Sequence, residues 1–390
     1  MTGRFRALAR RMADIAPFHV MALLARAKEL EAEGRSVIHM EIGEPDFPTA
    51  APLVAAGQRA LAEGRTRYTA AAGLPELRQA ISEHYRIRYG VEVPARRILI
   101  TPGASGALQL AAALLVNPDD RVLMADPGYP CNRHFVRLVE GEPVGVPVGP
   151  DSGYQLTAQL VERYWDHRTA AVLLASPANP TGTVVAPDEL SAIIATAEAR
   201  GGRVIVDEIY HGLSYGATPQ TALAYSERVL AINSFSKYYG MTGWRLGWLV
   251  APDDCVNDAE KLGQNLFLAA STPAQYAALA AFTPEAQAIF EERRQGFQAR
   301  RDFLLPALRE LGFRIPVTPD GAFYLYADCS RFTDDSYGFA LGLLEQTGVA
   351  ITPGLDFGNH LPERHVRFAY TNAIPVLAEG VERLRRALAA

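Results

Sequence analysis

The chain has few cysteines and no apolar run long enough to cross a membrane. Its three cysteines, Cys131, Cys255 and Cys329, are odd in number and lie far apart. That pattern is typical of a protein from a reducing compartment and not of a disulfide framework, so we expect a cytoplasmic protein. No apolar run approaches the ~18 residues that are needed to span a bilayer, which argues against a membrane protein.

The sequence also lacks the patterns of two common classes of binding protein. Its 38 lysines and arginines stand against 43 aspartates and glutamates, so the net charge is -5 and offers no positive excess to a nucleic acid. Among the eight histidines, His360 and His365 lie five apart in a proline-containing loop, instead of four apart on a helix. We therefore expect no nucleic-acid partner and no metal site.

Short apolar runs alternate with segments of helix length between residues 96 and 252. The runs cover residues 97–101, 121–126, 171–176, 203–210, 228–235 and 245–251. Such alternation predicts an α/β fold, with a mostly parallel central sheet that helices cover on both faces. With 390 residues and 49% hydrophobic content, the chain is long enough for a large core and more than one domain.

The C-terminal part has a different pattern. Residues 285–312 predict a long helix that is bent or broken near Pro306, because proline cannot donate the helical hydrogen bond. Shorter strand-like and helical stretches follow and indicate a smaller α+β domain. We expect an N-terminal arm and part of the small domain in residues 1–50, a large domain in 51–285 and the small C-terminal domain in 286–390.

The segment SFSKYYGMTGWRLG, residues 234–247, places Arg245 eight positions after Lys237. It supplies a nucleophilic amine and, separately, a fixed cation that suits a phosphate. A cofactor that carries both an aldehyde and a phosphate would need the two together. Taken alone, the pair is also consistent with two solvated surface charges.

A second segment, SPANPTGTV at 176–184, directly follows an apolar run. Asn179 lies between Pro177 and Pro180, and this stiff backbone would hold its side-chain amide in one direction. Such a loop can aim a donor at an oxygen of a ligand. The alternative is an ordinary turn, because Asn-Pro and Thr-Gly are common in turns.

In a third segment, residues 203–213, a strand-like run leads directly into Asp207, and Tyr210 follows three positions later. A carboxylate at the carboxyl end of a parallel strand points into the crevice where α/β sheets bind ligands. Beside a pyridine nitrogen it would keep that nitrogen protonated. Tyr210 could reach the other side of the same ring. The alternative role for Asp207 is a helix N-cap.

A fourth segment, residues 96–116, has a short apolar run, a Pro-Gly turn and then small residues that open an apolar helix. The first turn of a helix presents unpaired N–H groups and the positive end of the helix dipole. Gly103, Ala104 and Ser105 are therefore placed to hold a phosphate, although the loop matches neither common phosphate-binding motif.

Together and in this order, the four segments resemble the fold type I pyridoxal-phosphate enzymes, and within them the class I aminotransferases related to aspartate aminotransferase. The resemblance runs from IHMEIGEPDF at 38–47 through residues 68–81 and DPGYP at 126–130 to VRFAYT at 366–371. It implies fold type I, the cofactor pyridoxal 5′-phosphate, an amino acid and a 2-oxo acid as substrates, and a homodimer with shared active sites.

The resemblance also implies a role for each residue that contacts the cofactor ring. Lys237 would form a Schiff base with the cofactor and then move the proton as general acid and base. Asp207 would pair with the ring nitrogen, and Asn179 and Tyr210 would hydrogen-bond the ring oxygen. Tyr129 would lie against the ring face. Alternatively, Tyr129 is an ordinary tyrosine of the protein core.

Further implied residues bind the phosphate and the substrate. The phosphate would be held by Ala104, Ser105, Ser234, Ser236 and Arg245. Tyr68 would complete this phosphate site from the partner subunit. Arg367 would bind the substrate α-carboxylate with its planar fork, and Gly43 and Asn179 would lie beside the substrate.

Two other functions stay open from these residues. A lyase of the same fold, of the C–S lyase type, or a decarboxylase would use the same lysine and aspartate. Arg367 and the breadth of the resemblance favour transamination. A transcription regulator that reuses the fold would carry a DNA-binding domain first, but only about 35 residues precede the IHMEIGEPDF segment.

The sequence argues against a strict preference for dicarboxylic substrates. One subgroup of aspartate aminotransferases uses an arginine of the partner chain for the second carboxylate, yet no arginine occurs here between Arg245 and Arg293. Another subgroup has a lysine in the phosphate loop, where this chain has Ser105. Alanine-like, branched, aromatic and broad substrate ranges all stay open.

Overall fold

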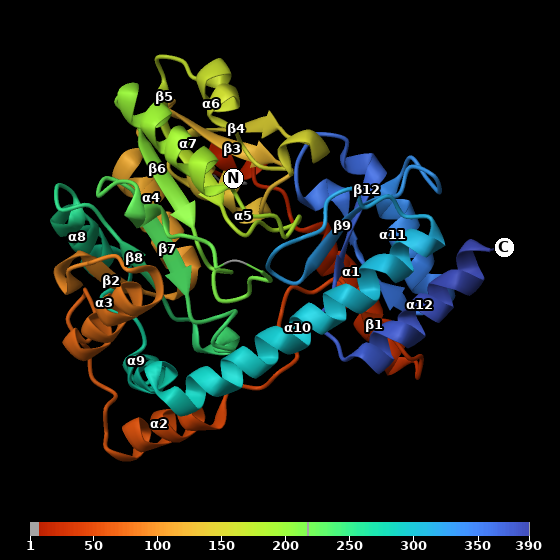
Figure 1. Ribbon diagram of the computed structural model, residues 1–390, viewed down its shortest axis with the longest axis horizontal. Helices are drawn as coiled ribbons and strands as arrows, with labels where there is room; N and C mark the ends of the chain where they lie inside the picture. The colour runs from red at the N-terminus through yellow and green to blue at the C-terminus, as the bar shows by residue number, and fades with distance from the viewer. Residues whose placement is uncertain (1–7, 217, 390) are drawn as a thin grey trace, which may run out of the picture.

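A computed structural model describes residues 8–216 and 218–389, so residues 1–7 of the predicted N-terminal arm lie outside the described part. Its larger part is built on a seven-stranded sheet in the order β2-β8-β7-β6-β5-β3-β4 (Figure 1). The strands are β2 (Ile98–Thr101), β3 (Arg121–Asp126), β4 (Glu142–Pro147), β5 (Thr169–Ala175), β6 (Arg203–Asp207), β7 (Leu230–Ser234) and β8 (Gly247–Val250). Strands β3 to β7 pair in parallel, and only β8 runs antiparallel to its neighbours β7 and β2. The predicted mostly parallel sheet is confirmed.

Helices cover both faces of this sheet. One face carries α4 (Gly103–Leu115), α5 (Pro130–Leu138) and α8 (Val256–Phe267), and the other carries α6 (Ala158–Tyr164) and α7 (Pro187–Ala199). Alternate residues of β5 show why both faces are apolar. Leu173 packs in the core below α4, whereas Val172 and Leu174 pack in the core below α7. The helices α2 (Ala51–Ala62), α3 (Pro75–Tyr89) and α9 (Thr272–Leu279) pack together beside the β2 edge.

The smaller part joins the two ends of the chain. A three-stranded antiparallel sheet has the order β11 (Thr352–Pro353), β12 (His365–Ala369) and β9 (Tyr324–Asp328). Beside it β1 (Ile38–His39) pairs in parallel with β10 (Val349–Ala350), and α1 (His19–Ala32), α11 (Ser336–Thr347) and α12 (Ile374–Leu388) pack around them. The N-terminal segment therefore folds with C-terminal residues. The boundaries that we place at residues 50 and 285 stay predictions.

One long helix, α10 (Pro284–Leu311), extends from the α9 end of the larger part to the smaller sheet (Figure 1). Of the predicted bend or break near Pro306, the break is wrong, because the helix continues through this residue. Pro306 is exposed, so the carbonyl that it leaves without a helical partner can bind water. Leu304, Leu305 and Leu308 on the opposite face are buried and hold the last turns in place.

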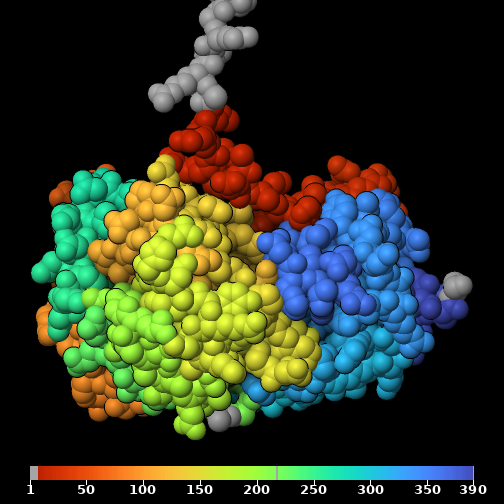
Figure 2. Space-filling view, turned by 90° about the horizontal axis from the view of Figure 1, so that it is seen from above, coloured from red at the N-terminus to blue at the C-terminus, as the bar shows by residue number. Residues whose placement is uncertain are grey.

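The chain before α1 crosses the top of the molecule, from the larger part to the smaller one, as the red segment of Figure 2 shows. The backbone N–H groups of His19 and Val20, in the first turn of α1, donate to the two carboxylate oxygens of Asp356 at 2.7 and 2.9 Å. The start of α1 is therefore fixed to the smaller part. No helix of residues 8–216 and 218–389 is both long and apolar enough to span a membrane.

Candidate active site

A cavity of about 280 Å³ lies between the two parts, beyond the carboxyl ends of β5, β6 and β7. Nearly all of the site residues expected from the sequence line it: Gly43, Ala104, Ser105, Tyr129, Asn179, Asp207, Tyr210, Ser234, Ser236, Lys237, Arg245 and Arg367. Tyr68 does not line it and is 82% exposed. One cavity therefore contains the amine of Lys237, the carboxylate of Asp207, the start of α4 and the guanidinium of Arg367.

Lys237 lies in the turn after β7 and extends into this cavity. Its Nζ atom donates to the carbonyl oxygen of Gly43 at 2.6 Å and lies 5.8 Å from the centre of the Phe323 ring. Burial lowers the pKa of Lys237 to about 8, because an ammonium group loses hydration there. The charges of Arg367 and Arg245 also lower this pKa, and the carboxylates of Glu44 and Asp207 oppose them.

Gly43 approaches the cavity so closely that a side chain has no room. A Cβ atom at this position would lie 2.0 Å from the hydroxyl oxygen of Tyr324. The carbonyl that anchors Lys237 and the tyrosine that closes the cavity therefore both depend on a residue without a Cβ. The role expected of Gly43 beside the substrate stays a prediction.

Asp207 ends β6 and is 5% exposed. Its Oδ1 atom accepts a hydrogen bond from the N–H of Ile209 at 3.1 Å, and the chain continues as a turn. The alternative of a helix N-cap is therefore wrong. Burial raises the pKa of Asp207 to about 6, against the lowering effect of the Ile209 N–H and the Lys237 charge. Above that pH the cavity contains a buried negative charge.

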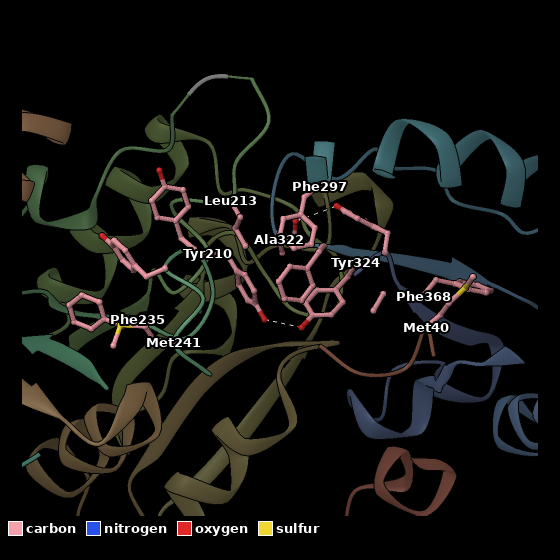
Figure 3. Close-up of a cluster of buried hydrophobic side chains, with 14 of the residues drawn as sticks. Met40, Tyr210, Leu213, Phe235, Met241, Phe297, Ala322, Tyr324 and Phe368 are labelled. Atoms are coloured by element: carbon pink, nitrogen blue, oxygen red, sulfur yellow. Dashed lines mark hydrogen bonds between the residues drawn. The ribbon is translucent and has the colours of Figure 1, made fainter. Parts of the chain in front are cut away.

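Tyr210 and Tyr324 meet at the side of the cavity. Their hydroxyl oxygens are 2.9 Å apart, and their rings are nearly perpendicular, at 84° (Figure 3). Burial raises the pKa of Tyr210 well above its usual value, so its hydroxyl keeps the proton. Sequence reasoning missed Tyr324, because its strand β9 resembles any buried strand and reaches the cavity only through packing of the two parts.

Arg367 of β12 and Asn179 form a direct contact at the cavity wall. The Nη1 atom of Arg367 donates to Oδ1 of Asn179 at 2.8 Å, and its Nη2 atom donates to Oγ1 of Thr352 at 3.1 Å. The guanidinium carbon lies 4.3 and 4.9 Å from the ring centres of Tyr324 and Phe357. Its Nε atom is buried and has no hydrogen-bond partner within the described residues. Arg367 is thus held in position while its Nε–H has no partner within the described residues.

The residues expected to bind a phosphate surround the start of α4. Oγ of Ser234 accepts from the N–H of Ser236 at 3.0 Å, and Nη1 of Arg245 donates to the carbonyl of Thr242 at 3.0 Å. A Cβ atom on Gly103 would lie 2.6 Å from Nη2 of Arg245. The arginine therefore lies directly against the first turn of α4, where helical N–H groups are unpaired.

The remaining wall comes from two regions, and the sequence pointed only to the first of them. Tyr129 lies on one side, and its hydroxyl accepts a hydrogen bond from Sγ of Cys131 at 3.2 Å. Because Tyr129 lines the cavity, it is not simply a tyrosine of the protein core. Across the cavity stand residues of the α1 start and of the segment before β12, namely Phe18, Val20, Met21, Asp356 and Phe357. The α1 pattern predicts only an ordinary amphipathic helix, so no local signal assigned these residues.

Comparison with known proteins agrees with this geometry. The family model "Aminotransferase class I and II" matches residues 35–384. The valine–pyruvate aminotransferase of Mycobacterium tuberculosis is 40% identical over 95% of this chain and 96% of its own length. A crystal structure of an aminotransferase from the same organism superimposes with a TM-score of 0.95 over 99% of this chain and 100% of that chain, at 40% identity. The aspartate aminotransferase of Thermus thermophilus, solved with maleate, gives a TM-score of 0.92 at 34% identity, over 98% and 100% of the two chains.

The chain therefore belongs to the class I and II aminotransferases, enzymes that move an amino group between amino acids and oxo acids. Members of this family use pyridoxal 5′-phosphate. The cavity fits that cofactor, because it offers an amine to the aldehyde, a buried carboxylate to the ring nitrogen and a helix start with an arginine to the phosphate. Because Gly103 packs closely against Arg245, the guanidinium and the first N–H groups of α4 lie side by side. Among the described residues, no group of His, Cys, Asp and Glu side chains could hold a metal ion.

The lowered pKa of Lys237 gives a pH-dependent test on the cofactor-free protein. Acetylation by acetic anhydride needs the neutral amine, so the rate at Lys237 should rise with pH and reach half its maximum near pH 8. For a lysine with the ordinary pKa of 10.5, the midpoint would lie near pH 10.5. Mass spectrometry of peptides measures each lysine separately, and Lys28 and Lys261 serve as internal controls. A midpoint at Lys237 above pH 10 would contradict the effect of burial.

Proposed function

We propose that Lys237 is the catalytic lysine of transamination between an L-amino acid and a 2-oxo acid, and that the residues around it have the roles implied by the sequence. The observation that carries this proposal is the single cavity that contains Lys237, Asp207 and Arg367. An amine, a carboxylate and a guanidinium in one enclosed space are the groups that the reaction requires for bond formation, ring protonation and substrate binding.

Five groups would hold the cofactor phosphate: the N–H of Ala104, the hydroxyls of Ser105, Ser234 and Ser236, and the guanidinium of Arg245. Asp207 would face the ring nitrogen, Asn179 and Tyr210 the ring oxygen, and Tyr129 the ring face. When bound, pyridoxal phosphate supplies an aldehyde for covalent attachment of an amine and a protonated ring that withdraws electrons from the substrate Cα–H bond.

Asn179 is oriented for this role by its contact with Arg367. Because its Oδ1 atom accepts the Arg367 hydrogen bond at 2.8 Å, its NH₂ group is the end left to donate to a ligand oxygen. The Nε–H group of Arg367, which has no partner within the described residues, would donate to the α-carboxylate of the substrate. A planar fork fixed between two rings needs little further ordering when a carboxylate arrives.

Lys237 would carry the proton between substrate atoms. Its anchor, the Gly43 carbonyl, holds Nζ at the cavity wall, and the lowered pKa makes a neutral amine accessible near neutral pH. A base whose pKa lies near the working pH transfers protons most effectively. An ordinary lysine would stay charged and would be a poor base under the same conditions.

A single-turnover experiment with Lys237→Ala tests the function and this residue together. With excess L-amino acid, the wild-type holoenzyme should release a 2-oxo acid and leave the amino group on the cofactor, whereas Lys237→Ala should slow this conversion by roughly 10²–10⁴-fold. Lys261→Ala, on the exposed surface of α8, is the matched control and should match wild type. Ammonia and pyruvate from a β-substituted amino acid would indicate elimination instead, and wild-type rates for Lys237→Ala would reject the assignment.

We also propose a homodimer in which Tyr68 of each chain completes the phosphate site of the other. Tyr68 is 82% exposed, and Leu61 of α2 and Leu268, directly after α8, are 58% and 57% exposed. Oγ1 of Thr272 donates to the carbonyl of Arg67 at 2.7 Å, so the segment that carries Tyr68 is fixed to α9. Exposed apolar groups on one fixed surface support a partner there.

Subunit complementation tests the shared site. A hybrid dimer that combines a Lys237→Ala chain with a Tyr68→Ala chain has one site with both residues native and one site that lacks both. We expect the hybrid to show about half of wild-type activity, because site sharing restores one native site out of two. The two single-variant homodimers are the controls, and each should be less active than the hybrid. A hybrid no more active than an equal mixture of the two homodimers would contradict the sharing of sites between chains.

For the compartment, we propose the cytoplasm. The thiols of Cys131, Cys255 and Cys329 are all free, and a protein with free cysteines suits a reducing compartment.

A further inference from the structure

The cations that line the cavity already have roles in the proposed function. They are Lys237, Arg245 and Arg367, and the lining residues within the described part include no fourth lysine or arginine. Once Lys237 holds the cofactor, Arg245 the phosphate and Arg367 the α-carboxylate, no cation of the described residues is left in the cavity for a second carboxylate of the substrate. A buried carboxylate without a cation loses hydration that no other group replaces.

On one side of Arg367 the cavity is lined by apolar residues. Phe357 packs on the Arg367 guanidinium at 4.9 Å, and its neighbour Asp356 binds the first N–H groups of α1. These contacts connect Arg367 with the α1 start, where Phe18, Val20 and Met21 line the same cavity. A substrate whose carboxylate is on Arg367 therefore extends its side chain near the start of α1.

The charge nearest to this apolar wall is negative. Asp356 is 5% exposed and lines the cavity. Its two oxygens accept the N–H groups of His19 and Val20, so this carboxylate lies at the positive N-terminus of α1. An acidic side chain at this wall would meet a like charge, whereas an apolar side chain would meet Phe18, Val20 and Met21.

Another arginine, Arg133, lies near this apolar wall but in a different cavity. Arg133 lines a second cavity of about 340 Å³, which shares Phe18, Pro130 and Asp356 with the first. The guanidinium of Arg133 lies near the carboxylates of Asp126 and Asp356. Arg133 lines this second cavity and is not among the residues that line the cavity of Lys237.

We infer that this enzyme acts on amino acids and oxo acids with apolar side chains, and that Phe18, Val20 and Met21 form the side-chain subsite. The inference rests on the proposed function, since it takes Arg367 as the binder of the α-carboxylate. Both half-reactions use the same cavity, so donor and acceptor share this preference.

Substrate pairs of similar shape and different charge give the first test. L-Leucine and L-aspartate differ mainly in charge, as do L-methionine and L-glutamate. In single-turnover conversion of the cofactor, we expect the apolar member of each pair to have an apparent second-order rate constant at least about tenfold higher. Equal or faster conversion of aspartate and glutamate would overturn the inference and leave transamination intact. Conversion of none of the four would overturn the proposed function itself.

Substitution at the wall gives the second test, with a closely matched control. Met21 and Met12 have similar exposed fractions, 52% and 51%, but only Met21 lines the cavity. Met21→Lys introduces the missing cation, so the leucine-to-aspartate ratio of rate constants should fall at least about tenfold. Met12→Lys should leave the ratio unchanged. An equal ratio in both variants and wild type would overturn the role of the α1 start.

Binding without turnover gives a readout that does not depend on the reaction. The carboxylic acids 4-methylpentanoate and succinate correspond to leucine and aspartate without the amino group. By titration calorimetry of the holoenzyme, 4-methylpentanoate should bind at least about tenfold more tightly than succinate, and Met21→Lys should reduce that difference. Tighter binding of succinate to wild type would overturn the inference.

Discussion

Burial of the Lys237 amine is the constraint on which the rest of the site depends. Nζ has given up water for one carbonyl oxygen, that of Gly43 at 2.6 Å, and its pKa falls to about 8 as a result. This contact requires the chain at Gly43 to approach Tyr324 more closely than any Cβ would permit. The larger part supplies the lysine, while the N-terminal segment supplies the carbonyl. Packing of the two parts therefore creates the nucleophile.

The same burial acts in opposite directions on the two principal charges. It lowers the pKa of Lys237 and raises that of Asp207, because both charged forms lose hydration. Each charge moderates the shift of the other, so an amine and a carboxylate with pKa values of about 8 and 6 share one cavity. Near neutral pH a small change in surroundings is enough to move a proton on either group. A site that takes a proton from one atom and returns it to another needs groups poised in this way.

Local sequence context predicted those parts of the site in which strand, turn and functional residue are adjacent in the chain. Asp207 at the end of β6, Asn179 after β5 and the start of α4 at Gly103 are of this kind. Tyr324 and the start of α1 were missed because they reach the cavity only through packing between distant segments.

In the fold, strand β4 was missed because prolines and a glycine interrupt its apolar pattern. The predicted break of α10 at Pro306 was wrong because an exposed helix carbonyl can bind water in place of the missing N–H group.

Reductive trapping can show directly that Lys237 is the amine that bonds to the cofactor aldehyde. The chain contains Lys28, Lys237 and Lys261 and no other lysine, so a trapped adduct can be assigned to one peptide. Purified protein would be incubated with pyridoxal phosphate, reduced with borohydride, digested and analysed by mass spectrometry. The account predicts one adduct for each chain, on the peptide that contains Lys237. An unmodified Lys237, with the adduct on Lys28 or Lys261 or on no peptide, would contradict it.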